Sequence, residues 1–269
     1  MRILSPLFII AVLAQAQAAT AHELWLEPLD YQVANEGQLK ARILNGEEFV
    51  GTALPYLPQR FRHFVVSVGD RNVQVPGRPG DAPGLNMSAQ GEGLHVVAYQ
   101  SKPQTITYQT WEKFQKFVDH KDFGDVRPLH DARGLPAEGF KEAYVRYSKT
   151  LIGVGNAAGA DKRMGLETEL VALTNPYTDD LSGGMKVQLY YGQEVRANEQ
   201  VEVFSKAPGG RVTVTLVRTD ANGIATIPVS SGTSYQLDAV VLREPDATMA
   251  QNTGAVWETL WANLTFEAP

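Results

Sequence analysis

The chain contains no cysteine among its 269 residues. This absence excludes disulfides, thiolate metal sites and cysteine nucleophiles. It also excludes a lipid-modified cysteine behind an export signal. It does not argue against an oxidising compartment, which permits disulfides without requiring them. A chain of this length buries enough apolar surface to fold without such cross-links.

Positive charge is also in short supply. The 24 Lys and Arg residues are outnumbered by 30 Asp and Glu residues, which gives a net charge of −6 with neutral histidines. Phosphate contacts require a basic face, so a nucleic-acid partner is not expected. The acidic balance favours solubility and a mild attraction for cations.

Long apolar runs are missing outside the N-terminus. Ile3 to Leu13 is strongly apolar but shorter than the ~20 residues that cross a bilayer. Arg2 precedes this run, and small residues ending in Ala19-Thr20-Ala21 follow it. This order is typical of a cleavable secretory signal. We therefore predict a signal peptide over residues 1–21, a periplasmic location, and a mature chain that does not span a membrane.

Strand patterns dominate the rest of the chain. Apolar and polar residues alternate from Glu23 to Glu27 and from Gln38 to Leu44, and Phe61 to Val68 is a strong β run. Further short strands separated by turns, such as Ala221-Asn222-Gly223, follow after residue 168. Many short strands at this spacing predict a mainly β fold with two β-sandwich domains of immunoglobulin-like or transthyretin-like type.

In the middle of the chain, the spacing of the apolar residues changes from that of strands to that of helices. Thr110 is a plausible N-cap, and the aromatic residues that follow it recur at helical spacing, which predicts a helix over 110–118. A second helix is predicted from about Pro136 to Ile152. The polar segment from Lys121 to Gly134 is interpreted as a loop, and Gly153 to Arg163 as a mobile connector.

These patterns predict three parts in the mature chain. Residues 22–108 form an N-terminal β-sandwich, residues 109–174 a helical and loop connector, and residues 175–269 a C-terminal immunoglobulin-like β-sandwich.

His22 is the most informative single residue. Cleavage after Ala21 would make it the first residue, so its free amine and its imidazole could chelate one metal ion. A second histidine would complete a T-shaped site of three nitrogens, which suits Cu(II) or Ni(II). Cleavage after Ala19 would place the histidine third, which also binds these ions. Cleavage after Ala18 or Ala16 would give neither arrangement.

The other histidines are candidate partners for His22. His63 and His95 lie in predicted strands, where packing or exposure is the more common role. His120 and His130 lie in or beside the polar segment, near carboxylates that could help to bind a divalent cation, although a solvated loop is the simpler interpretation. These carboxylates are Asp119, Asp122, Asp125 and Asp131. No His-x-His or His-x-x-x-His spacing typical of zinc occurs.

Two glutamates near the start of the mature chain are candidate oxygen donors. Glu23 and Glu27 share one strand face and could supply oxygen ligands near His22, although a solvated face is their ordinary role. Ser148 does not lie in a Gly-x-Ser-x-Gly motif, and the glycine-rich stretches lack a phosphate-binding lysine. We therefore predict no catalytic residue and no enzymatic activity.

The start of the mature chain resembles a known family. Ala21-His22-Glu23-Leu24-Trp25-Leu26-Glu27-Pro28 is similar to the opening of NikM-like periplasmic proteins, which are described as periplasmic components of a cobalt/nickel transport system. Similar segments extend along the mature chain: Gly46–Phe49, Val96–Tyr99, Tyr144–Lys149, Gly165–Leu170 and Trp257–Phe266. The resemblance implies a periplasmic location, two β-sandwiches and a transition-metal role. Of the site residues, only His22 matches a family motif.

The sequence thus favours a periplasmic protein that binds a divalent transition metal, Ni(II), Co(II) or Cu(II), and passes it to a membrane transporter or an outer-membrane receptor. Two alternatives stay open. One is a metal-free interaction or adhesion module of the cell envelope. The other is a copper enzyme of the N-terminal-histidine type.

Overall fold

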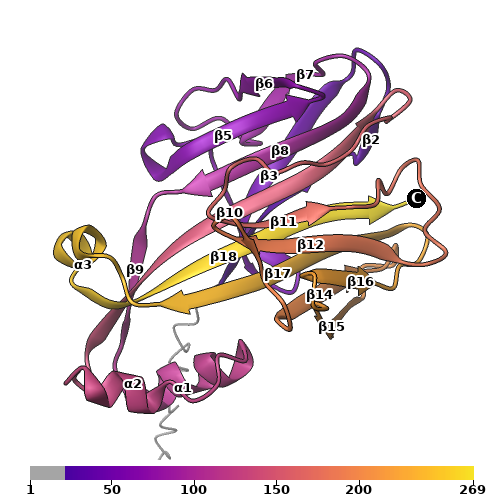
Figure 1. Ribbon diagram of the computed structural model, residues 1–269. Helices are drawn as coiled ribbons and strands as arrows, with labels where there is room; N and C mark the ends of the chain where they lie inside the picture. Colours follow the sequence, from indigo (N-terminus) through magenta and orange to yellow (C-terminus); the bar gives the residue numbers. More distant parts are fainter. Residues whose placement is uncertain (1–21) are drawn as a thin grey trace, which may run out of the picture.

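A computed structural model of the protein describes residues 22–269, which fold as a mainly β structure built from three sheets (Figure 1). The predicted fold class is therefore confirmed. The predicted signal peptide, residues 1–21, lies outside the described residues. No helix between His22 and Pro269 combines the length and the apolar character that a bilayer crossing needs.

A ten-stranded sheet forms the centre of the molecule, in the order β15-β14-β17-β18-β10-β8-β5-β6, with β2 and β9 also paired to β10. Strand β10 pairs in parallel with β18 over most of its length. The strands are β2 (Gln32–Val33), β5 (Phe61–Val68), β6 (Arg71–Gln74), β8 (Gly93–Ser101), β9 (Gln104–Tyr108), β10 (Phe140–Val154), β14 (Gln200–Lys206), β15 (Val212–Arg218), β17 (Thr233–Arg243) and β18 (Ala255–Ala268).

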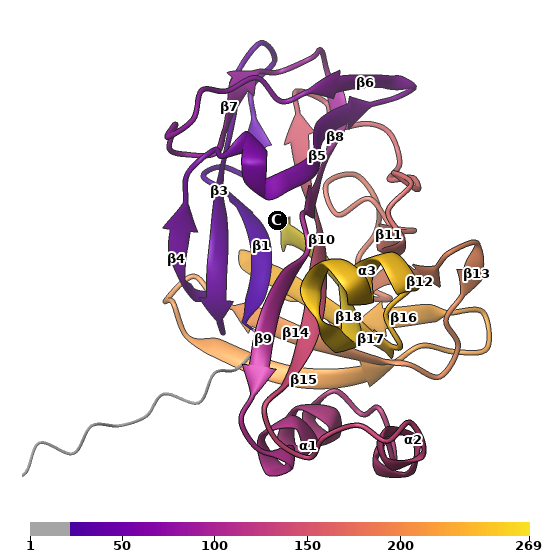
Figure 2. The same cartoon turned by 90° about the vertical axis from the view of Figure 1, so that its left-hand side faces the viewer.

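Two four-stranded sheets cover the large sheet. The first contains β1 (Glu23–Pro28), β3 (Gln38–Glu47), β4 (Val50–Leu54) and β7 (Leu85–Ser88), and the second contains β11 (Thr168–Ala172), β12 (Met185–Tyr191), β13 (Glu194–Val195) and β16 (Ile224–Ile227). Figure 2 shows the β1 sheet and the β12 sheet on either side of the large sheet.

On β8 and β10, consecutive residues contribute to different hydrophobic cores. Val97 and Ile152 pack with the β1 sheet, whereas Val96 and Leu151 pack with the β12 sheet. Successive side chains of a strand point to opposite faces, so the two small sheets lie on opposite faces of the large one. The protein therefore has two sandwich cores that share one sheet.

The predicted first helix is confirmed as α1 (Trp111–His120), with Trp111, Phe114 and Val118 buried. The polar segment interpreted as a loop contains a further short helix, α2 (Arg127–Ala132). Both helices pack on an aromatic cluster with Tyr108, Phe140 and Trp257. Two elements complete the fold, the 3-10 turn Pro58–Arg60 and α3 (Ala247–Thr253).

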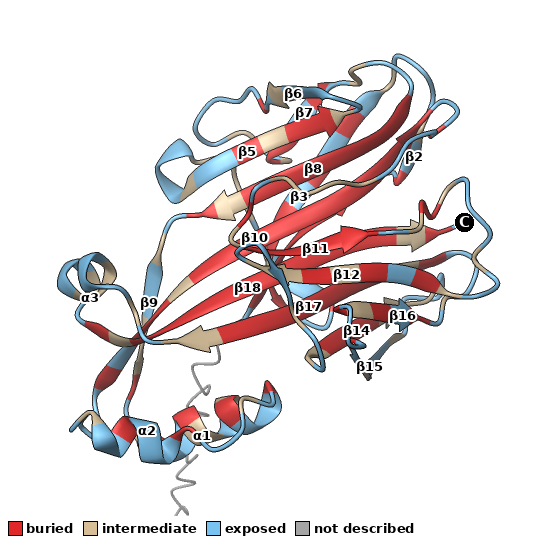
Figure 3. Ribbon diagram, viewed as in Figure 1, coloured by how far each residue is buried: buried red, intermediate tan, exposed pale blue. Residues whose placement is uncertain are grey.

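The predicted second helix, from about Pro136 to Ile152, is wrong, because β10 occupies most of this range. Strand β10 is buried on both faces along nearly its whole length (Figure 3). Such a strand lacks the alternation of apolar and polar residues that identifies half-buried strands. The segment 109–174, predicted as a helical and loop connector, thus supplies the strand that joins β8 to β18.

Candidate functional site

A cluster of buried charges lies where β1 begins, where α1 ends and where β14 and β17 run side by side. Glu202 of β14 is the direct partner of Asp238 of β17, so both side chains lie on the same face of the large sheet. Their apolar neighbours Val203 and Leu237 point to the opposite face, into the core under the β12 sheet. The face with Glu202 and Asp238 is the one that β1 covers, and Glu23 of β1 is buried with them.

Lys121 supplies a cation to these three carboxylates. Its Nζ lies 3.1 Å from Asp238 Oδ2 and 3.5 Å from Glu23 Oε1, and it also contacts Glu202 Oε2. The same ammonium lies 4.6 Å from the ring centre of Trp261. Lys121 directly follows the last residue of α1, so the helix end positions its side chain.

The protonation states within the cluster differ. Burial raises the pKa of Glu23 to about 7, although the charge of Lys121 opposes this shift. Burial also raises the pKa of Asp238. Burial acts in the same direction on Glu202, but the hydrogen bond with His120 and the charge of Lys121 outweigh it and lower the pKa of Glu202. Burial thus favours the protonated forms of Glu23 and Asp238, whereas the basic neighbours of Glu202 favour its ionised form.

His22 lies at the edge of the cluster. Its Nδ1 is 3.0 Å from Glu47 Oε1, and its side chain is 46 % exposed. Its carbonyl oxygen accepts a hydrogen bond of 2.8 Å from Arg146 Nε and a second one from Nη2 of the same guanidinium. Arg146 stacks between Tyr144 and Trp261, at 4.3 and 4.9 Å from their ring centres. The backbone of His22 is therefore held, while its imidazole is accessible.

His120 contacts the same cluster from the end of α1. Its Nε2 lies 2.6 Å from Glu202 Oε1, and its side chain is 62 % exposed. The hydrogen bond with Glu202 raises the pKa of His120 against the effect of partial burial. A continuous set of contacts thus leads from His120 through Glu202 and Lys121 to Glu23, the residue next to His22.

The remaining candidate histidines lie apart from this cluster. His63 is exposed on β5. The buried His95 accepts a hydrogen bond of 3.0 Å from the Gln90 backbone at Nε2, and its Nδ1 lies 3.1 Å from the carbonyl of Gly93. The buried His130 accepts a hydrogen bond of 3.0 Å from Trp257 Nε1 at Nδ1, and its Nε2 lies 3.0 Å from the carbonyl of Pro136. Both ring nitrogens of these two buried histidines are therefore already engaged.

The carboxylates named with them in the sequence are spread out. Glu23 joins the cluster, whereas Glu27 pairs with Arg42 and Lys206, at 2.6 and 2.9 Å. Asp122 pairs with Arg218. Asp131 pairs with Arg127 at 2.8 Å, and Asp119 accepts a hydrogen bond from Gln115. The structure gives no common centre for the four loop aspartates.

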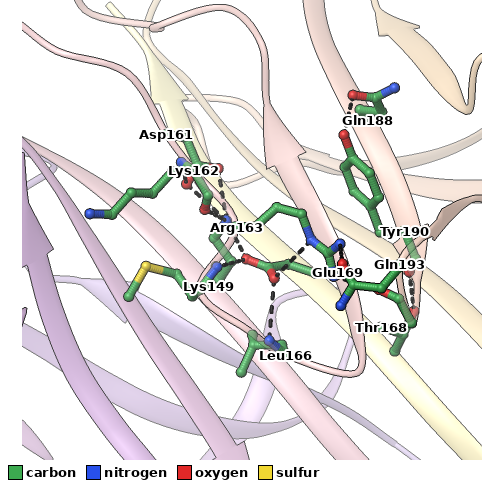
Figure 4. Close-up of polar contacts among 12 residues, drawn as sticks. Lys149, Asp161, Lys162, Arg163, Leu166, Thr168, Glu169, Gln188, Tyr190 and Gln193 are labelled. Carbon is green, nitrogen blue, oxygen red and sulfur yellow. Dashed lines mark hydrogen bonds and ion pairs between the residues drawn. The ribbon is translucent and has the colours of Figure 1, made fainter. Parts of the chain in front are cut away.

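A second buried ion cluster surrounds Lys149 of β10 (Figure 4). Lys149 Nζ lies 2.8 Å from Asp161 Oδ1 and 3.0 Å from Glu169 Oε1, and it also donates to the carbonyl of Lys162. The two carboxylates accept further hydrogen bonds from backbone amides, including that of Leu166. Because donors and acceptors pair within the protein, this cluster fastens the segment after β10 and offers no coordination position.

The site lies within a recognised family region. A family model described as a domain of unknown function (DUF4198) matches residues 19–243. The chain belongs to this family. The DUF4198 match includes His22, Lys121, Glu202 and Asp238, so the whole charge cluster falls inside it. No curated protein matches the chain.

Among solved structures, the chain is similar to a crystal structure described as a tetra-tandem repeat in the extending region of a large adhesion protein. The sequence identity is 13%, the TM-score is 0.20, and the match covers 92% of this chain and 50% of that one. The chain thus spans half the length of this matched structure.

Proposed function

We propose that the protein is exported to the periplasm, cleaved after Ala21, and binds a divalent transition-metal ion through the amine and the imidazole of His22. The observation that carries this proposal is the position of the imidazole. Its Nδ1, the nitrogen nearer to the backbone, faces Glu47 Oε1 at 3.0 Å. An ion held between the amine and Nδ1 closes a six-membered ring, and Glu47 adds an oxygen donor on the same side.

The backbone around His22 favours such a chelate. Glu23 and Gly46 are direct partners in the pairing of β1 with β3, which places His22 beside Glu47. Arg146 holds the carbonyl of His22 from the other side. Fixing the chelating residue in advance reduces the conformational entropy that metal binding would otherwise cost.

His120 is the histidine that best fits the role of second nitrogen donor. It is exposed, and its partner Glu202 shares Lys121 with Glu23, the residue next to His22. His95 and His130 have both ring nitrogens engaged in hydrogen bonds, and His63 lies on β5, outside the charge cluster. Nitrogen donors with a carboxylate suit Cu(II), Ni(II) and Co(II).

The proposed role of the protein is to bind and release the ion without any chemical reaction. The resemblance of the chain opening to NikM-like periplasmic proteins supports delivery to a membrane transporter or an outer-membrane receptor. Because the amine and the imidazole must both lose a proton, metal affinity should fall as the pH falls.

Calorimetric titration of the chain 22–269 with Cu(II) and with Ni(II) tests the proposal. The expected result is one ion per chain, with affinity lowered about a hundredfold or more in His22→Ala and unchanged in His63→Ala, a matched exposed histidine. Equal affinities in the wild type and in His22→Ala would refute this function.

One observation favours a second candidate function, interaction with another envelope protein. β15 is an outer strand of the large sheet, with Val214 41% and Leu216 62% exposed. Exposed edge strands accept an additional strand from a partner. Protection of the β15 amides against hydrogen exchange at high protein concentration, lost in Val214→Lys, would support association through this edge, with a second copy of the chain as the partner.

A further inference from the structure

A row of buried polar side chains crosses the large sheet beneath β1. Glu202, Asp238 and Asn263 are direct partners on the adjacent strands β14, β17 and β18, and each is 2% exposed. Gln236, fully buried, precedes Asp238 by two residues and therefore lies on the same face. Glu23 faces this row from β1, and one carboxylate oxygen of Glu23, Glu202 and Asp238 lies within 4.8 Å of those of the other two.

The hydrogen-bonding capacity of this row is not used up. Both amide atoms of Asn263 and both of Gln236 are buried without a hydrogen-bond partner among the described residues, and so is Glu23 Oε2. A buried polar group without a partner costs about 1–3 kcal/mol, so such groups rarely gather at one place without a role. They contrast with the Lys149 cluster, where the two carboxylates and the ammonium are fully paired.

The charge balance of the cluster depends on His120. Lys121 and Arg146 are the two permanent cations that act on Asp238 and Glu23, against three carboxylates with Glu202 included. A protonated His120, in contact with Glu202, completes the balance, whereas a neutral His120 leaves one negative charge in excess. In that second state, a divalent cation in place of the Lys121 ammonium would make the charges equal.

Lys121 is also the one member of the cluster that does not come from a sheet. It follows α1, in the helical insert between β9 and β10, whereas the carboxylates and Asn263 lie on paired strands. Its side chain can therefore leave the cluster without breaking a strand pair.

We propose that Glu23, Glu202 and Asp238, with the amide oxygen of Asn263, form a binding site for a hard divalent cation, which the ammonium of Lys121 closes when no ion is bound. The donors are all oxygens, the set that Ca²⁺, Mg²⁺ and Mn²⁺ prefer over softer metals. The site is separate in chemistry from the nitrogen chelate at His22, and the displaced Lys121 would carry the end of α1 with it.

Terbium luminescence tests this site directly. Tb³⁺ is a hard ion that binds oxygen ligands, and the Trp261 ring, which contacts Lys121, can sensitise its emission. Titration of the chain 22–269 with Tb³⁺ is expected to give saturable emission that Ca²⁺ or Mn²⁺ competes away. Asp238→Asn should weaken binding about tenfold or more, whereas Asp70→Asn, an exposed aspartate in the turn after β5, should leave it unchanged.

The variant Lys121→Met distinguishes a cation-binding site from an ion pair that only stabilises the fold. Without the competing ammonium, Tb³⁺ should bind about tenfold more tightly, and Ca²⁺ or Mn²⁺ should restore the melting temperature that the variant loses. If the variant does not fold, the wild-type titration decides alone. The proposed site is refuted if the wild type gives no sensitised emission. It is also refuted if the emission is unchanged in Asp238→Asn. His22→Ala should keep Tb³⁺ binding while losing Cu(II), so failure of either proposal is visible separately.

Discussion

His120 Nε2 lies 2.6 Å from Glu202 Oε1, which joins the last residue of α1 to the middle of β14. The same helix end carries Lys121, which contacts Glu202 through the other carboxylate oxygen. Glu202 thus receives two basic side chains from two consecutive residues. This arrangement brings a candidate metal-binding histidine to the region where the mature chain would begin.

Replacement of His120 by alanine should weaken Cu(II) or Ni(II) binding about tenfold without abolishing it, because the His22 amine and imidazole would still bind the ion. Calorimetric titration of the chain 22–269 measures the effect, with His63→Ala as the matched control. An unchanged affinity in His120→Ala would exclude it as the second nitrogen donor.

Lys149→Met should destabilise the protein by about 3–5 kcal/mol, because it leaves the carboxylates of Asp161 and Glu169 buried without their cation. Urea unfolding at neutral pH measures this loss. Lys186→Met, at an exposed position of β12, should change the stability by less than about 0.5 kcal/mol. Similar losses in the two variants would show that the Lys149 cluster contributes no more than a surface charge.

Glu142 makes the stability depend on pH in a defined direction. It is fully buried on β10, accepts a hydrogen bond from Thr259, and has a pKa raised to about 7 by burial. Between its unfolded pKa near 4.5 and this folded value, the folded state holds a proton that the unfolded state has lost, so stability falls as the pH rises.

Glu142→Gln should therefore be more stable relative to the wild type at pH 8 than at pH 5, by up to about 3 kcal/mol. Chemical unfolding at the two pH values measures this difference. Glu138→Gln, at an exposed position just before β10, should show no such pH dependence. A stability difference between Glu142→Gln and the wild type that stays constant with pH would mean that Glu142 does not titrate in this range.

The sequence predicts the half-buried strands and α1 because their periods are visible in the residues themselves. β10 was missed for a physical reason: as a central strand it is buried on both faces, and its polar residues Arg146, Ser148 and Lys149 are buried by specific partners. Nothing in a single sequence distinguishes such residues from the polar side of a helix.

The candidate site was predictable only in part. The cleavage motif points to His22, and Glu23 stands out by its place next to His22. Glu202 and Asp238 were missed because they alternate with apolar residues, as on a solvated strand face, and only the packing of β1 over that face buries them. From the sequence alone Lys121 belongs to a polar loop, because its long-range contacts depend on the tertiary fold.

The central claim is that the amine and the imidazole of His22 act together on one metal ion. The most direct test compares Cu(II) affinity for the chain 22–269 with that for the chain 17–269, which keeps the imidazole but moves the free amine five residues away. The account predicts binding about a hundredfold or more tighter for the chain that begins at His22. Equal affinities for the two chains would contradict it.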